Sequence, residues 1–172
     1  MKYSLTSEGK KIASLPPGPT KEEAKESLKR IKAVRDWLKI NGVSLQFSWK
    51  HTSHFQFERN VVVLNARLST KKKLIILLHE VGHFLVGSKR EGERYVYGYA
   101  SNAIDSRGNR HKLDILDEEF EAWAQGWQIG LTLGVINPQR DRDDWDRVKY
   151  EALNLYIDWV KNPSVRTIEG FN

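Results

Sequence analysis

The sequence predicts an α+β fold in which a small sheet lies between one helix and three later ones. Apolar residues recur at helical spacing over residues 20–40, 70–87, 113–135 and 142–161. Between the first two of these segments, residues 43–64 contain three short runs rich in β-branched and aromatic residues. A length of 172 residues, with 40% hydrophobic and 29% charged residues, suits one globular domain with a sizeable core.

The first helix is expected to follow a tail. Residues 1–19 end in Ser-Leu-Pro-Pro-Gly-Pro, which is typical of a linker, and they contain no apolar segment long enough for a signal peptide. Thr20 and Glu23 form a T-x-x-E capping box, and Asn41-Gly42 marks the helix end. One apolar stripe runs along this helix: Ala24, Leu28, Ile31, Val34 and Leu38.

The strands are expected to form a mostly antiparallel sheet of three or four strands. Apolar residues alternate over residues 43–49, which is the period of a half-buried strand. Residues 54–57 are a second candidate, and residues 61–64 (Val-Val-Val-Leu) a third. Glu58-Arg59-Asn60 between them reads as a turn, so an edge strand within residues 54–64 could pair with an extended peptide.

The segment that follows carries the chemistry. His79-Glu80-Val81-Gly82-His83 is an H-E-x-x-H motif inside an apolar run that begins at Leu74. Residues four apart share one face of a helix, so His79 and His83 can both bind one metal ion, with Glu80 beside its open side. Buried polar groups are costly without partners, and a metal would supply one. Gly82 permits close approach of another segment.

Composition limits the other possibilities. The absence of cysteine excludes disulfides and thiolate metal sites and suits a reducing compartment, so a cytoplasmic protein is expected. The longest apolar run, residues 74–78, is too short to cross a bilayer. A net charge of +6 favours acidic partners, nucleic acid among them, but a solvated basic face that includes Lys71-Lys72-Lys73 is the expected explanation.

A catalytic zinc usually takes three protein ligands, and the motif supplies two. The extended H-E-x-x-H-x-x-G-x-x-H pattern does not continue, because Val86 and Lys89 stand at its glycine and third histidine. The third ligand should therefore be a carboxylate or a distant histidine. The richest stretch of carboxylates is Asp117-Glu118-Glu119-Phe120-Glu121.

The helix over residues 113–135 has a face of smaller residues that could approach the motif helix: Ala122, Gly126, Ile129 and Leu133. At about 100° per residue, Glu118 and Glu119 lie roughly 50° to either side of the centre of that face. Glu121 lies about 110° away and is the poorer candidate. Periodicity therefore leaves Glu118 and Glu119 open.

Three segments together resemble the ImmA/IrrE family of zincin-type metallopeptidases: Val61-Val62-Val63-Leu64-Asn65, Leu74 to His83, and Glu119-Phe120-Glu121-Ala122-Trp123-Ala124. The resemblance implies a minimal zincin-like fold with one Zn²⁺ per chain, or another divalent ion such as Mn²⁺. His79, His83 and Glu119 would be the ligands, since only Glu119 starts an E-x-x-A motif, and Glu80 would be the general base. It also implies a regulatory metalloprotease that cuts a specific protein, such as a DNA-binding repressor.

Further residues are candidates for the donor that stabilises an oxyanion, and the sequence does not rank them: Tyr95, Tyr97, Tyr99, Arg107 and His111. The expected domain spans residues 20–162, with a C-terminal tail over residues 163–172. The alternative to an enzyme is a metal-containing binding module without catalysis, which recognises a protein or a nucleic acid.

Overall fold

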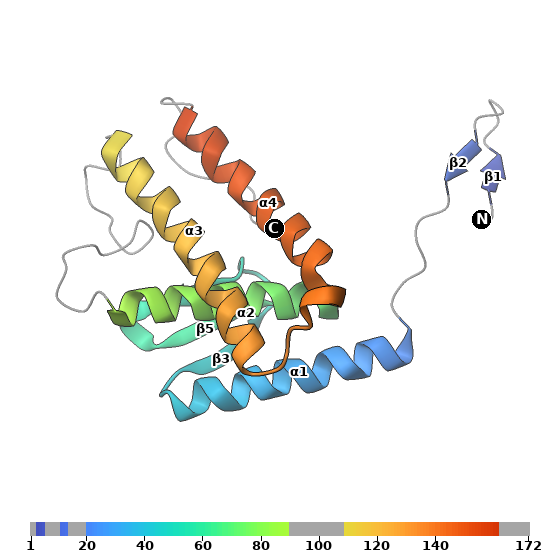
Figure 1. The fold of residues 1–172 in the computed structure, drawn as a ribbon, viewed down its shortest axis with the longest axis horizontal. Coiled ribbons are helices and arrows are strands. Elements are labelled where there is room, and N and C mark those ends of the chain that lie inside the picture. Colours follow the sequence, from blue (N-terminus) through green and yellow to red (C-terminus); the bar gives the residue numbers. More distant parts are fainter. Residues whose placement is uncertain (1–2, 6–10, 14–19, 90–108, 162–172) are drawn as a thin grey trace.

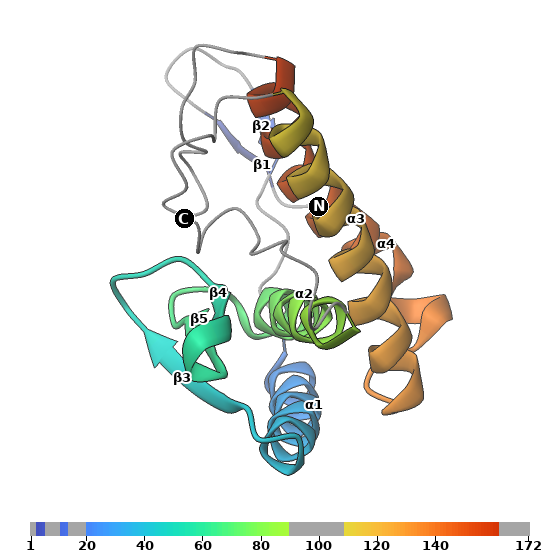
Figure 2. The same cartoon turned by 90° about the vertical axis from the view of Figure 1, so that its left-hand side faces the viewer.

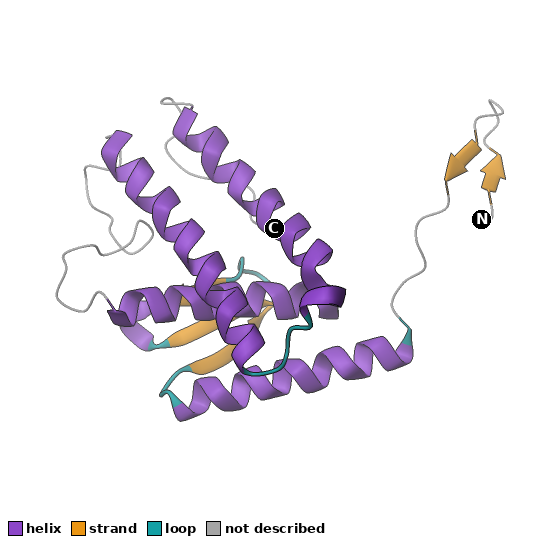
Figure 3. Cartoon of the chain, viewed as in Figure 1, coloured by secondary structure: helices purple, strands orange, loops and turns teal. Residues whose placement is uncertain are grey.

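Four helices and a small mixed sheet form the body of the molecule, as Figure 1 and Figure 3 show. The structure is a computed structural model and describes residues 3–5, 11–13, 20–89 and 109–161. The α+β class is confirmed, and the arrangement matches the minimal zincin-like fold that was expected. The elements of this body are α1 (Lys21–Ile40), β3 (Ser44–Ser48), β4 (His54–Gln56), η1 (Phe57–Arg59), β5 (Val61–Asn65), α2 (Thr70–Lys89), α3 (Asn109–Thr132) and α4 (Pro138–Lys161).

The sheet differs from expectation in one respect. β5 lies in the centre, pairs in parallel with β3 and pairs antiparallel with β4, so only one of its two pairings is antiparallel. All four residues from Val61 to Leu64 are buried, which suits a central strand covered on both faces. The apolar alternation over residues 43–49 predicted burial only in part, because Val43 is buried and Leu45 half-buried but Phe47 and Trp49 are exposed. It carries no information on strand direction. Asn60, in the left-handed region at φ 50°, ends the turn before β5.

The N-terminal segment also contains secondary structure. β1 (Tyr3–Leu5) pairs antiparallel with β2 (Lys11–Ala13), within the residues that were expected to be a tail. The expected C-terminal tail, residues 163–172, lies outside the described residues.

Side-chain caps set the helix starts. The expected capping box of α1 is present, with hydrogen bonds in both directions between Thr20 and Glu23. The Ser69 hydroxyl accepts from the backbone of Lys72 at the start of α2. α4 begins at Pro138, four residues before the expected start, because the Asn137 side chain caps it and proline suits the first helical position.

Figure 2 shows the layers: α1 and α2 lie between the sheet on one side and α3 with α4 on the other. Core residues of all three layers meet on α2, and the largest of these are Trp123 of α3 and Trp145 of α4. The two tryptophan rings pack edge to face with centroids 5.3 Å apart. No helix in the described ranges is both long and apolar enough to cross a membrane.

α2 and α3 cross with their backbones in contact. A Cβ at Gly82 would lie 1.9 Å from the Ala122 carbonyl oxygen, and one at Gly126 would lie 2.4 Å from that of Leu78. Each helix therefore offers a glycine where the other presents its main chain. The expected small face of α3 does face α2, and this brings the carboxylates before Ala122 close to the motif.

A partly buried ion pair joins the first of the four helices to the last. Arg30 of α1 lies 3.0 Å from the Asp141 carboxylate of α4. The same carboxylate oxygen of Asp141 accepts from the backbone N–H of Asn137 at 2.8 Å. Asp141 therefore both caps the start of α4 and fixes it against α1.

Candidate metal centre

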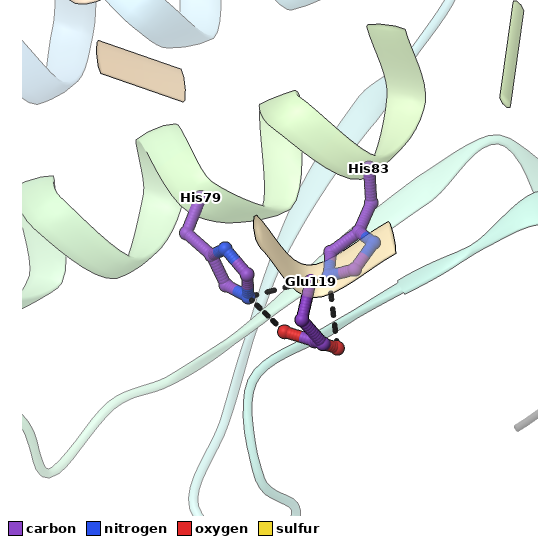
Figure 4. A group of neighbouring side chains, drawn as sticks. All are labelled: His79, His83 and Glu119. Carbon is purple, nitrogen blue, oxygen red and sulfur yellow. Dashed lines mark hydrogen bonds and ion pairs between the residues drawn. The ribbon is translucent and has the colours of Figure 1, made fainter. Parts of the chain in front are cut away.

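Three side chains from two helices converge on one point (Figure 4). His79 and His83 extend from α2, and their Nε2 atoms lie 3.2 Å apart. Glu119 extends from α3, with Oε2 at 3.3 Å from His79 Nε2 and Oε1 at 3.5 Å from His83 Nε2. His79 and His83 are the two motif residues that were predicted to share one helix face. Glu119 is one of the two carboxylates between which helical periodicity could not decide.

The distances fit a metal ion. Ligands bound to zinc at about 2.0–2.1 Å in tetrahedral geometry lie about 3.3 Å from one another. The two ring nitrogens are 3.2 Å apart, and each lies 3.3 or 3.5 Å from its nearer Glu119 oxygen. Glu119 Oε2 is buried and makes no hydrogen bond within the described part of the chain, although His79 Nε2 is near. A proton shared between His79 Nε2 and His83 Nε2 satisfies only the contact between the two rings. A cation would satisfy both ring nitrogens and the Glu119 carboxylate together. The site could therefore hold a metal.

Glu118 also turns toward α2, but it meets a different atom. Its Oε1 lies 3.1 Å from His83 Nδ1, the ring nitrogen that faces away from His79. Glu121 is half-buried and is not one of the three converging residues. The two carboxylates that periodicity could not separate thus contact opposite sides of one histidine ring.

The charges of the cluster depend on one another. Burial would lower the pKa of His83, but the charges of Glu119 and Glu80 and the hydrogen bonds that the ring donates to Glu118 and Glu119 raise it well above its ordinary value. Burial would raise the pKa of Glu119, but the charge of His83 and the contacts with both histidines lower it below its usual range. The pKa of His79 is lowered, mainly by burial. Without metal, these shifts favour a protonated His83 beside an ionised Glu119.

Glu80 lies beside this cluster and is almost fully buried. Burial raises its pKa to about 7, the charge of His83 opposes the rise, and the charge of Glu119 adds to it. A hydrogen bond from the main chain of Phe55 also reaches the Glu80 carboxylate. Phe55 belongs to β4, an edge strand of the described sheet, so Glu80 lies between the metal-binding groups and that edge.

Trp123 is a member of the site that sequence reasoning did not single out. Its ring stacks on His79 with centroids 4.1 Å and planes 17° apart. The residue follows Ala122 on α3 and is completely buried. The available signal was its place one position after the small face, next to the segment that carries the carboxylates.

The expected oxyanion donors fall outside what the structure describes. Tyr95, Tyr97, Tyr99 and Arg107 lie outside the described residues. His111 lies in the first turn of α3, and its side chain is outside the described part of the structure.

Comparison with known proteins agrees with this geometry. Neither the curated proteins nor the solved structures gave a match. The family model for the IrrE N-terminal-like domain, Peptidase_M78, matches residues 36–123, which is half of the chain and ends on Trp123. The matched segment contains His79, Glu80, His83 and Glu119, and the match points to a peptidase. On this evidence the chain belongs to the family of the IrrE N-terminal-like domain.

Proposed function

We propose that this chain is a zinc-dependent peptidase whose metal is held by His79, His83 and Glu119. The observation that carries the proposal is the convergence of these three side chains beside a buried glutamate with a pKa near neutrality. When bound, zinc supplies Lewis acidity, which acidifies water and polarises a carbonyl group. Mn²⁺ would offer related chemistry on the same donors.

Glu80 is the proposed general base. A pKa of about 7 lets its carboxylate take a proton from water at neutral pH and return it to the leaving amine. The buried setting keeps bulk water away from the carboxylate, and the Phe55 main chain holds it in one orientation. The protein's own residues therefore both shield the proton acceptor from bulk water and orient it.

β4 is the proposed site for the substrate backbone. It is an edge strand of the described sheet, and Phe55 within it hydrogen-bonds to Glu80. An extended peptide that paired with this edge would pass beside the base and the metal-binding groups. The proposed substrate is one specific protein, such as a DNA-binding repressor, as the resemblance to the ImmA/IrrE metallopeptidases implies.

The nucleic-acid-binding alternative has less support from the charges. Of the three clustered lysines, Lys71 forms an ion pair with Asp144, and Lys72 lies 3.4 Å from Glu151, both on α4. Arg147 pairs with these same two acids. Part of the basic surface is therefore neutralised within the fold, which reduces its attraction to phosphates.

The test compares wild type with Glu80→Gln, using Glu58→Gln as a control because Glu58 is exposed. Zinc-loaded protein is incubated with a proteome-derived peptide library, and new termini are read by mass spectrometry. Wild type and the control should cleave. Glu80→Gln should keep one zinc per chain and lose at least about 100-fold in rate. Cleavage by Glu80→Gln at the wild-type rate would contradict the mechanism.

The same samples separate the enzyme from the binding module. Removal of zinc by a chelator should abolish cleavage, and zinc should restore it. If wild type cleaves nothing but binds nucleic acid with strong salt dependence, and Glu80→Gln binds equally, the binding module is the better account.

A further inference from the structure

We propose that Glu118 is a positioning residue that orients His83 for metal binding by accepting a hydrogen bond from its Nδ1–H. The inference rests on the proposed function, because it assigns a role toward the metal held by His79, His83 and Glu119. It concerns a residue that the E-x-x-A motif does not include.

The first step is the geometry of the His83 ring. Its Nε2 atom faces His79 and Glu119, and its Nδ1 atom lies 3.1 Å from Glu118 Oε1. An ionised carboxylate only accepts hydrogen bonds, so the proton of a neutral His83 must be on Nδ1. That tautomer leaves the lone pair of Nε2 free to bind a metal.

The second step is the burial of Glu118. Its side chain is only 4% exposed, less than that of His83 at 13%. A buried carboxylate is costly unless it is paired, and this one has a histidine nitrogen within hydrogen-bond distance. The contact is therefore built into the packing of α2 and α3 and is not a chance meeting of surface side chains.

The third step is the contrast with His79. The Nδ1 atom of His79 is buried and has no hydrogen-bond partner among the described residues. Its ring is fixed instead by stacking on Trp123. The two histidines are thus oriented by different means, and Glu118 does for His83 what the tryptophan does for His79.

The experiment measures zinc affinity by competition with a chromophoric chelator, together with the visible absorption spectrum of the Co²⁺ form. The variants are Glu118→Ala, which removes the acceptor, and Glu118→Gln, which keeps an acceptor oxygen without the charge. Asp117→Ala and Asp117→Asn are matched controls, because Asp117 is the preceding carboxylate on α3 and is exposed.

Glu118→Ala should bind zinc about 10–100-fold more weakly than wild type and change the Co²⁺ spectrum. Glu118→Gln should recover most of the affinity, and both Asp117 variants should match wild type. Circular dichroism of the metal-free proteins checks the fold. If Glu118→Ala does not fold, Glu118→Met, which fills a similar volume without an acceptor oxygen, takes its place: weaker zinc binding than in Glu118→Gln supports the proposal, and equal binding in the two overturns it.

Three results would overturn the inference while leaving the proposed function intact. These are wild-type affinity in folded Glu118→Ala, a loss in Glu118→Gln as large as in Glu118→Ala, and an equal loss in the Asp117 variants. The last two would mean that charge, and not the hydrogen bond, sets the affinity. Failure of wild type to bind zinc would instead overturn the proposed function.

Discussion

His79 and His83 lie one turn apart on α2 and meet the same carboxylate, yet their surroundings differ. His79 is held in an aromatic setting, stacked on Trp123, and burial lowers its pKa. His83 is held between Glu118 and Glu119, and the pKa of its ring is raised despite burial. One half of the site is thus maintained by packing and the other half by charge. Substitutions that disturb the packing should therefore change the stability differently from substitutions that disturb the charges.

The largest difference should come from replacing each histidine in the metal-free protein. His83→Ala leaves two buried carboxylates without their counter-charge and should lower the free energy of unfolding by about 3–5 kcal/mol at neutral pH. His79→Ala creates a cavity beside Trp123 and should cost less, about 2–3 kcal/mol. Urea unfolding measures both, and both variants should fail to hold stoichiometric zinc.

Adding Glu119→Gln separates the two causes. In His83→Ala it removes one unpaired charge and should restore part of the lost stability. In His79→Ala it removes the partner of His83 and should lower stability further. If the added substitution changes the stability of both variants in the same direction, the contrast between packing and charge is wrong.

Gly82 lies between the two histidines, so a change there should affect both. In Gly82→Ala the new methyl group would overlap the Ala122 main chain, and α2 and α3 would have to separate. We expect a loss of about 3 kcal/mol in unfolding free energy, the upper end of what overpacking usually costs. Zinc affinity should fall too, because Glu119 would move away from both rings.

Gly134→Ala is the control for this substitution. Gly134 has φ +64° and no atom within 4 Å of a built Cβ. Its replacement should cost about 1–2 kcal/mol from backbone strain alone and should leave zinc binding unchanged. Equal effects of the two substitutions would show that the helix contact does not set the site.

The last effect depends on pH and concerns Glu80, which belongs to the charged half. Its folded pKa of about 7 lies above the ordinary 4.5, so the folded state holds this proton more tightly than the unfolded chain. That contribution to stability is fully present below pH 4.5 and is lost as the pH rises through 7. The free energy of unfolding of metal-free Glu80→Gln should therefore exceed that of wild type by up to about 3 kcal/mol at pH 8.

The difference should shrink toward zero as the pH falls to 4.5, which urea titrations at several pH values would measure. Glu58→Gln, on the exposed η1 turn, should match wild type throughout. A difference between Glu80→Gln and wild type that stays constant from pH 5 to 8 would contradict the raised pKa.

Local chemistry accounts for what the sequence predicted. The capping box at Thr20 and Glu23, the motif helix and the small face around Ala122 and Gly126 depend on neighbours within a few residues, and all are present. Helix starts were predicted less well: the last helix was expected from residue 142, but the Asn137 cap and Pro138 start α4 at residue 138. The pairing of β3 with β5 joins residues that are far apart in the sequence, from Ser44 with Val61 to Ser48 with Asn65. No local pattern specifies the direction of this pairing.

The candidate site divides in the same way. Spacing on one helix brought His79 and His83 together, but the choice between Glu118 and Glu119 depends on how α3 crosses α2. Both carboxylates turn inward, and only the crossing decides which ring nitrogen each one meets. The stack of Trp123 on His79 has the same origin, so helical periodicity could not have predicted it.

The Arg30–Asp141 pair has a consequence for where this protein can be cut. Both residues lie outside the segment 36–123 that the family shares, one before it and one after it. The ion pair holds α4 against α1, and the ring of Trp145 on α4 packs on Trp123 at the end of that segment. A fragment trimmed to the shared segment would expose Trp123 to water and would lack both Arg30 and Asp141. A fragment that keeps this ion pair and the cover over Trp123 should therefore include both α1 and α4, and it would extend beyond the family boundaries at both ends.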